Sequence, residues 1–567
     1  MKRIVVLIFI IPILGACVSG GGWKDSGINP VQQQVPFTKG VTFTHWFEFV
    51  GSVQGIHFSR YNEQTFADVK GLDVDVIRLP IDFSLFASGA PDYEIDPLFF
   101  KFLDMAVDWA VKYQIYIIFD NHPASQPPVR NDYRNFLIPV WTQMAEHYKN
   151  RNEYVIYEIL NEPNRISANA WGKMQGGVVD AIRKVDKNHW IVVSGIHTGN
   201  NPAEGLSFLP KYSDNKLLYT FHFYDPHVFT HQGVAWTDLP QMASLGGVPF
   251  PYDKERMPKT PNDLKGTWVE NELMNYSTRG TTAALTKKID QVTKFIKQRN
   301  VPVFCGEFGV YMCTCLHEDR VMYYRFIRES LEARNIPWLI WDYYYPFGIF
   351  DPPGGVFIWG FIGDIKTDLN IELVRALGLV SPPQAQRQRE PLNTGFTIYD
   401  DRLNKGSTFD FSCRQTTINL YYTPAAEGEY AIHWGNISRK FDFINFQLAI
   451  SDFSYLAQNR FALEFKAKTG KPVSFDVKFF NLQDNTNWHI GYNITSRQLP
   501  PDEKWHIIRI PLMDMKLWGG DDKRSLQWVE PGGRTISWDN INNLEFTMVN
   551  EDGYVCEIYL DDIKITE

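Results

Sequence analysis

The sequence predicts a (β/α)₈ barrel, an α/β fold, followed by a smaller all-β sandwich of jelly-roll type. The chain has 567 residues, too many for one ordinary domain, so two domains are the default expectation. From residue 39 to about residue 380, short apolar strand patterns alternate with amphipathic helix patterns. After about residue 395 the helical periods vanish, and short alternating strands separated by turns take over.

The first part of the chain contains eight predicted strands. Their β-branched, aromatic and aliphatic residues are typical of strands covered on both faces. They lie at residues 40–46, 74–81, 114–120, 154–161, 190–195, 217–224, 301–307 and 337–343. Amphipathic helices are predicted between them, for example at residues 97–113, 134–149, 171–185, 281–299 and 320–334. Eight right-handed repeats of this kind close into a barrel. The alternative, a doubly wound open sheet, is disfavoured because no Gly-rich phosphate loop follows the first strand.

Residues 1–16 predict a lipoprotein signal peptide. Lys2 and Arg3 precede an apolar run at residues 4–14, which suits a signal-peptide core and is short for a membrane span. The run ends in Leu-Gly-Ala-Cys, which resembles the bacterial lipoprotein cleavage box and implies lipidation of Cys17. We therefore expect a secreted protein anchored to a membrane of the cell envelope, with the outer membrane as one option. An ordinary secretory peptide is the alternative.

Shifts in composition and segments rich in Gly and Pro set the remaining domain limits. Residues 17–36 are rich in Gly, Gln and Pro and predict a flexible tether. The barrel is expected at residues 37–379, a linker at 380–395 and the sandwich at 396–567. The net charge is −9 without a basic stripe, which argues against nucleic acid as a partner. The 17 Trp and 27 Tyr exceed the needs of a core, and flat rings suit sugar-binding clefts.

Polar residues gather at the carboxyl ends of the predicted strands, where barrels place their chemistry. The fourth strand ends in an Asn-Glu-Pro run at Glu162, and the seventh ends in a Gly-Glu-Phe-Gly run at Glu307. A barrel brings these two strands to opposite sides of one mouth, so the two carboxylates can face each other. One protonated and one ionised carboxylate are what glycosidic cleavage needs. The alternative for Glu162 is an acidic residue that caps the following helix.

Over about residues 37–378 the chain resembles glycoside hydrolase family 5. The resemblance is carried by the two runs at Glu162 and Glu307 and by other strand-end residues, which are Arg78, His122, His222, Tyr224 and Trp341. It implies that Glu162 is the general acid/base and Glu307 the nucleophile. Arg78 should lower the pKa of the strand-seven carboxylate, and the approach of that carboxylate should raise the pKa of Glu162.

The same resemblance implies the substrate contacts. Asn161 would hydrogen-bond the 2-hydroxyl of the sugar, and Tyr224 would touch the nucleophile. His122 and His222 would line the cleaved subsite, and Trp341 would form the floor of the −1 subsite. Many family members carry two adjacent histidines after the third strand, whereas this chain has Asn-His-Pro around His122. Purely structural roles for Arg78, His122 and Trp341 are the alternatives.

The expected activity is that of an endo-β-1,4-glucanase that acts on cellulose or mixed-linkage β-glucan with retention, as a monomer and without a catalytic cofactor. β-Mannanase and xyloglucanase activities are alternatives on the same scaffold, because loops decide the preferred backbone. A non-catalytic glycan-binding lipoprotein is the alternative from another class.

The predicted sandwich resembles jelly-roll carbohydrate-binding modules. Acidic residues near both of its ends predict a structural calcium ion. They are Asp400, Asp401, Asp561 and Asp562. Candidate sugar platforms are Trp434, Trp488 and Tyr492, with core packing as the alternative for each. Cys413 and Cys556 could pair, but their spacing does not decide it.

Overall fold

The computed structural model describes most of the chain from residue 34 to residue 567. The ranges it leaves out are 124–132, 198–201, 353–361, 386–390, 405–407, 412–415, 484–485 and 523–524, with the single positions 238, 345, 526 and 552. The predicted signal peptide, Cys17 and Cys413 lie outside the described residues. Within the described part of the chain, every helix is too short or too polar to cross a membrane.

Eight parallel strands close into a barrel in chain order, which confirms the predicted fold. They are β1 (Lys39–Thr42), β2 (Val76–Ile81), β3 (Tyr116–Asn121), β4 (Val155–Glu158), β5 (Trp190–Ser194), β6 (Leu217–Phe223), β7 (Val303–Phe308) and β8 (Trp338–Ile340). The last strand is shorter than predicted, but the amide of Trp341 still donates to the carbonyl of Phe308 at 3.0 Å.

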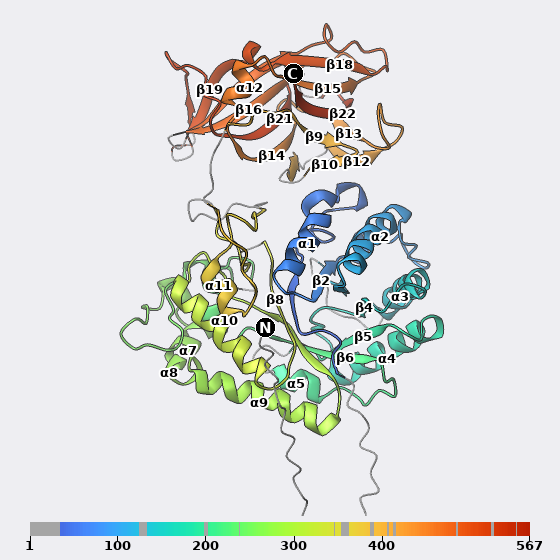
Figure 1. Ribbon diagram of the computed structural model, residues 1–567, viewed down its shortest axis with the longest axis vertical. Helices are drawn as coiled ribbons and strands as arrows, with labels where there is room; N and C mark the ends of the chain where they lie inside the picture. The colour runs from blue at the N-terminus through green and yellow to red at the C-terminus, as the bar shows by residue number, and fades with distance from the viewer. Residues whose placement is uncertain are drawn as a thin grey trace, which may run out of the picture.

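Helices surround the barrel (Figure 1). The longer ones are α1 (Glu63–Gly71), α2 (Pro97–Lys112), α3 (Arg134–Tyr148), α4 (Ala168–Val185), α9 (Thr282–Arg299) and α10 (His317–Glu332). Shorter ones are α5 (Pro202–Ser207), α6 (His227–Thr230), α7 (Trp268–Met274), α8 (Tyr276–Arg279) and α11 (Ile371–Ala376). Asn62 caps α1 through a reciprocal capping box, and Asp96 and Ser167 cap α2 and α4 with their side chains.

The barrel interior is layered, and the layers change in character along the strands. One layer is apolar and buried; it consists of Phe37, Val76, Ile118, Ile156, Val192, Leu218, Phe304 and Leu339. Side chains alternate in direction along a strand, so residues two positions further on face the same interior. On β2, β3 and β4 these residues are Arg78, Asp120 and Glu158, all buried. The carboxyl end of the barrel is therefore a charged layer stacked on a hydrophobic one.

The C-terminal domain consists of two antiparallel sheets, which confirms the predicted β-sandwich. One sheet contains β9 (Phe396–Asp400), β10 (Arg402–Leu403), β12 (Thr417–Tyr422), β13 (Ala431–Ile437), β15 (Ala462–Lys468), β18 (His506–Pro511) and β22 (Cys556–Thr566). The other contains β11 (Thr408–Phe411), β14 (Phe443–Ser451), β16 (Phe475–Gln483), β17 (Thr486–Ile494), β19 (Lys516–Asp522), β20 (Trp528–Val529) and β21 (Ile541–Met548). A short helix, α12 (Ser454–Gln458), precedes β15.

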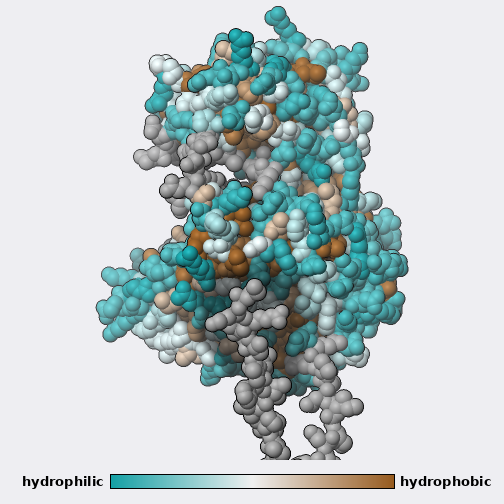
Figure 2. Space-filling view, viewed as in Figure 1, coloured by the Kyte–Doolittle hydropathy of each residue, from teal (hydrophilic) through white to brown (hydrophobic). Residues whose placement is uncertain are grey.

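The sandwich packs on the barrel beside α1 and α2 (Figure 1). Phe102 of α2 contacts Tyr421 of β12 with 4.6 Å between ring centroids, and the Tyr421 hydroxyl donates to the Ile56 carbonyl. Lys101 Nζ lies 2.5 Å from a carboxylate oxygen of Glu429. The visible face is mostly hydrophilic, with a group of hydrophobic residues on the barrel just below the sandwich (Figure 2). Ring packing, a hydrogen bond and an ion pair thus join the two domains.

Candidate active site

Arg78 is the centre of the charged layer at the barrel mouth. Its side chain is fully buried, and Nε and Nη2 donate to the two carboxylate oxygens of Glu158 at 2.8 and 3.0 Å. Nη1 donates to Glu307 Oε1 at 2.5 Å, and Nη2 lies 2.9 Å from Asp120 Oδ2. Burial alone would lower the pKa of Arg78, but the three carboxylates raise it well above its ordinary value. The forked guanidinium therefore fixes Glu307 in place.

A local irregularity between β6 and β7 aims Glu307 into the mouth. Phe221 pairs with Cys305, but the next residue, His222, pairs with Glu307, so Gly306 is bulged out of the register. A Cβ atom at Gly306 would lie 2.4 Å from Thr220 Oγ1. Only glycine fits so close to the neighbouring strand, which explains the first residue of the Gly-Glu-Phe-Gly run.

Glu162 and Glu307 face each other across His222. His222 Nδ1 lies 2.7 Å from Glu162 Oε1 and 3.4 Å from Glu307 Oε2. One oxygen of each carboxylate and the imidazole nitrogen all lie within 4.8 Å of one another. The Tyr224 hydroxyl donates to Glu307 Oε2 at 2.8 Å. Glu162 is held at φ +40°, in the left-handed region that non-glycine residues seldom occupy.

The pKa of Glu162 is lower than its ordinary value, so the predicted direction is wrong for the substrate-free site. Burial alone would raise the pKa, but the charge of His197, the hydrogen bond from His222 and the charge of His122 together lower it. Burial would lower the pKa of His222, yet Glu307 and Glu162 raise it. These opposite shifts favour an ionised Glu162 carboxylate beside a protonated His222 imidazole.

His122, Asn161 and Trp341 form the other side of the mouth. The ring of His122 stacks on Trp341 with 5.2 Å between centroids, and its Nδ1 lies 2.7 Å from Asp120 Oδ2. Burial would lower the pKa of His122, but Asp120 outweighs burial and raises it to about 9. Asn161 accepts from Arg78 Nη2 at 2.9 Å and turns its amide nitrogen toward His122 Nε2. All predicted barrel-site residues thus lie in one connected cluster.

Three further residues of this cluster lie outside the sequence-based assignment. Asp120 and Glu158 hold Arg78, and His197 places Nδ1 3.6 Å from Glu162 Oε1. Glu158 carries a detectable signal, because it is a charged residue inside an otherwise apolar strand. His197 follows β5 by a few residues and has no comparable signal in the sequence.

Glu162, His222 and Glu307 are the one group among the described residues whose ligand atoms converge closely enough for a metal ion. The chemistry of the group disfavours a cation. Both oxygens of Glu307 already accept hydrogen bonds, one from the Arg78 guanidinium and one from the Tyr224 hydroxyl. A positive guanidinium beside the site would repel a metal ion.

Two of the three candidate sugar platforms in the sandwich are core residues. Trp434 is fully buried on β13, and Trp488 is 4% exposed with the Arg534 guanidinium 4.7 Å from its ring centroid. Their indole faces pack inside the protein, so the prediction of exposed platforms at these two positions is wrong. Tyr492 is partly exposed, and a sugar contact there stays a prediction.

The predicted calcium residues contact loop amides and lysines. Asp561 Oδ2 accepts from the amides of Ala426 and Glu427, and Asp401 Oδ1 accepts from the amides of Glu429 and Tyr430. Asp562 accepts from Lys564 Nζ at 2.8 Å, and Asp400 is exposed. These bonds fix the loop between β12 and β13. The structural calcium ion stays a prediction.

A (β/α)₈ barrel with two facing carboxylates at its mouth defines the class of barrel glycoside hydrolases. The family model described as Cellulase (glycosyl hydrolase family 5) matches residues 38–346, more than half of the chain. The chain therefore belongs to glycosyl hydrolase family 5, as the sequence motifs predict.

Curated relatives carry endoglucanase names. Endoglucanase 3 of Fibrobacter succinogenes is 30% identical over 56% of this chain and 51% of its own length. Endoglucanase C of Acetivibrio thermocellus is 27% identical over 54% of this chain and 92% of its own length. Endoglucanase H of Acetivibrio thermocellus is 24% identical over 89% of this chain, and the match spans 51% of that protein. The chain thus spans about half the length of two of these relatives.

Proposed function

We propose that the chain is a retaining endo-β-1,4-glucanase that cleaves internal bonds of cellulose or mixed-linkage β-glucan. The observation that carries this proposal is the approach of the Glu162 and Glu307 carboxylate oxygens to within 4.8 Å. Retaining glycosidases hold their carboxyl groups about 5–5.5 Å apart, whereas inverting ones need about 6.5–9.5 Å to admit a water. The endoglucanase names of the relatives support the choice of a β-1,4-glucan.

Glu307 acts as the nucleophile. One oxygen of its carboxylate accepts from the Arg78 guanidinium at 2.5 Å, and the Tyr224 hydroxyl at 2.8 Å orients the second oxygen. Burial and the charge of Glu307 raise the pKa of Tyr224, so this phenol stays neutral and donates. Attack of Glu307 on the anomeric carbon breaks the glycosidic bond and forms a covalent glycosyl-enzyme.

Glu162 acts first as the acid and then as the base. The proton reaches the leaving oxygen from Glu162, which recovers it from His222 Nδ1 at 2.7 Å as substrate displaces water from the mouth. In the second step Glu162 takes a proton from the attacking water, and the bond between the sugar and Glu307 breaks. This step regenerates the free enzyme, and the released sugar has the same anomeric configuration as the substrate.

Product release from barley β-glucan, carboxymethylcellulose, xyloglucan and mannan tests the proposal, with the wild type and Glu307→Gln measured side by side. We expect the wild type to cleave a β-1,4-glucan and the variant to lose at least about a thousandfold in kcat, because the covalent step is lost. Glu464→Gln, on the sandwich surface, is the matched control for the amide substitution.

Other outcomes separate the alternatives. Cleavage of mannan or xyloglucan alone would keep the mechanism and change the substrate. A wild type that binds glucan and cleaves nothing would support a glycan-binding lipoprotein instead.

We also infer that the enzyme is anchored to a membrane through lipidated Cys17, on the basis of the Leu-Gly-Ala-Cys box. Cys17→Ser should move the enzyme from the membrane fraction to the soluble fraction of the cell envelope. A variant that stays in the membrane fraction would contradict this anchor.

A further inference from the structure

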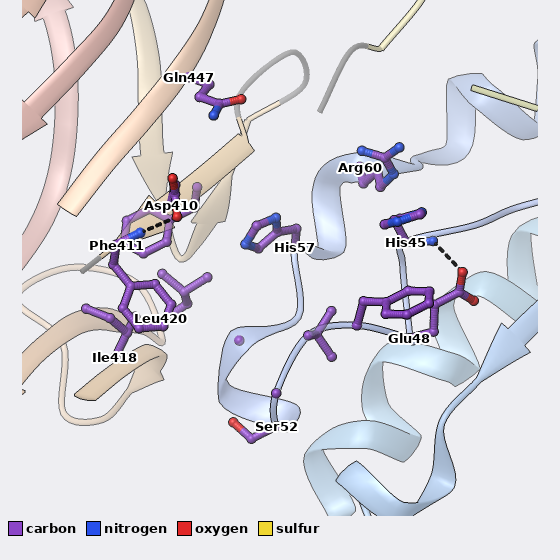
Figure 3. Close-up of a pocket in the computed structure, with 15 residues that line it drawn as sticks. His45, Glu48, Ser52, His57, Arg60, Asp410, Phe411, Ile418, Leu420 and Gln447 are labelled. Carbon is purple, nitrogen blue, oxygen red and sulfur yellow. Dashed lines mark hydrogen bonds between the residues drawn. The ribbon is translucent and has the colours of Figure 1, made fainter. Parts of the chain in front are cut away.

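A cavity of about 450 Å³ lies between the barrel and the sandwich (Figure 3). Its barrel side consists of the loop between β1 and α1, including the short turns η1 (Val53–Gly55) and η2 (Phe58–Arg60). Its sandwich side is the edge formed by β11 and β12. We call this cavity, lined by both domains, the interdomain pocket.

The lining combines aromatic rings with polar groups. Phe409 and Phe411 line the sandwich side together with Asp410 (Figure 3). On the barrel side, the exposed ring of Phe49 stacks on His45 with 5.1 Å between centroids. Aromatic faces that pack on sugar rings, beside side chains that bond hydroxyl groups, are the surface a neutral oligosaccharide requires.

Glu48 gives the pocket an unsatisfied polar group. The residue is fully buried; Oε1 accepts from the amide of His45 at 3.1 Å, whereas Oε2 has no hydrogen-bond partner among the described residues. A buried polar atom without a partner is costly, so a rotation of the Glu48 side chain that exposes Oε2 to a ligand hydroxyl would be favourable. Burial raises the pKa of Glu48 to about 8, so the protonated carboxyl group can donate as well as accept near neutral pH.

The loop that lines the barrel side of the pocket also contacts the proposed active site. Thr44 Oγ1 donates to Asp342 Oδ2 at 2.7 Å, next to Trp341 in the mouth. Phe47, which precedes Glu48, bridges to Ile81, and the Ile81 carbonyl accepts from the amide of His122 at 2.7 Å. One short loop thus contacts the catalytic mouth and lines the interdomain pocket.

The sandwich wall is held in a fixed place beside that loop. The Tyr421 hydroxyl donates to the carbonyl of Ile56, and the His57 ring lies edge-on to Phe409 with 6.3 Å between centroids. The side chain of Arg402 lies 5.7 Å from the Phe58 ring centroid. These contacts hold the sandwich edge that carries Phe409 against the barrel loop, which favours binding by reducing the ordering cost.

We propose that the interdomain pocket is a distal sugar subsite for the same β-linked glucan chain that is cleaved at Glu162 and Glu307. The sandwich then supplies one wall of the substrate groove through Phe409, Asp410 and Phe411. This inference rests on the proposed endoglucanase activity and assigns part of its substrate binding to the second domain.

Chain-length dependence tests the proposal in the full-length enzyme. Ser52→Trp fills the pocket from the barrel side, and Asp410→Ala removes a polar group from the sandwich side. The readout is the ratio of kcat/KM for cellohexaose to kcat/KM for cellotriose. We expect both variants to lower this ratio about tenfold, mainly through KM, which corresponds to about 1.4 kcal/mol of binding. Ser277→Trp, exposed on α8 away from the sandwich, is the control for an added indole and should leave the ratio unchanged.

Two outcomes would overturn one idea or the other. A ratio that is unchanged in both folded pocket variants would leave the pocket as a water-filled gap and contradict the proposal. Should Ser52→Trp fail the thermal unfolding check, the exposed Asp410→Ala decides alone. A wild type that cleaves no β-glucan would contradict the proposed function itself, and that failure is visible before any variant is made.

Discussion

The barrel mouth and the sandwich both carry clustered carboxylates, but these are satisfied in opposite ways. At the mouth, Asp120, Glu158 and Glu307 come from three different strands and share one buried guanidinium. In the sandwich, Asp401 and Asp561 accept from backbone amides of a single loop. Acids that converge from different strands onto one cation form a functional site, whereas acids bonded to a nearby loop stabilise the fold.

The largest effect should follow from the loss of Arg78. In Arg78→Met three buried carboxylates lose their cation, so we expect about 3–5 kcal/mol of destabilisation and loss of measurable kcat. The matched control is Arg509→Met, because Arg509 pairs with Glu464 at 3.1 Å on the surface of the sandwich. Exposed pairs of this kind are worth about 0–1 kcal/mol. Urea unfolding of both variants checks the contrast; equal losses would break the comparison.

Next in size is the effect of Gly306→Ala. The added Cβ meets Thr220 Oγ1 at 2.4 Å and must displace the bulge that aims Glu307. Misplacing a catalytic group by about 1 Å can cost about 100-fold in rate, and we expect a loss of this order in kcat. Gly71→Ala is the control, since nothing lies within 4 Å of a Cβ atom there. Activity close to wild type in Gly306→Ala would show that the bulge is dispensable.

The pH dependence tests whether Glu162 and His222 share a proton. Because the pKa of His222 is raised, the pair with Glu162 holds its proton below that pKa and loses it as the pH rises through it. The kcat/KM of the wild type should therefore decline at alkaline pH, with an apparent pKa above the ordinary pKa of histidine. In His222→Asn only Glu162 can hold the proton, so the alkaline decline in kcat/KM should move to lower pH.

His227→Asn is the control for that shift. Burial and the charge of His197 lower the pKa of His227 to about 4, so this histidine is already neutral at the pH of the alkaline decline. Its substitution should leave the position of the decline unchanged. A decline that stays in place in His222→Asn would contradict a proton shared by Glu162 and His222.

The smallest effect is expected in the sandwich. Asp561→Ala leaves the amides of Ala426 and Glu427 without an acceptor, which should cost about 1–3 kcal/mol of stability. The kcat on a short oligosaccharide should not change, because the residue lies on β22 of the second domain and bonds to the loop between β12 and β13. Asp502→Ala, at an exposed pair with His506, is the control and should cost less. A fall in kcat for Asp561→Ala would contradict a purely local role.

The sequence was most informative where topology forces residues together. Parallel strands of a barrel end at one mouth, so motifs around Glu162 and Glu307 could be paired without knowledge of the loops. The bulge at Gly306 and the hydrogen bond between His222 and Glu162 depend on atomic contacts between strands, and strand patterns do not reveal such contacts.

In the sandwich, the alternation of side chains along each strand indicates that two of the candidate tryptophans are buried, although the high aromatic content favoured a role in sugar binding. Trp434 alternates in phase with Ile432 on β13, and Trp488 with Ile490 on β17, so all four point into the core. The interdomain pocket could not be predicted, because it exists only where the edge of β11 meets the loop after β1.

The central claim is that Glu162 and Glu307 perform a double displacement. Proton NMR of a soluble β-1,4-gluco-oligosaccharide, recorded in the first minutes of cleavage, reports the configuration of the new reducing end. The account predicts that the β-anomer appears first and the α-anomer later by mutarotation, because two inversions restore the starting configuration. Initial release of the α-anomer would contradict the account, since it requires a water between carboxylates that approach to within 4.8 Å.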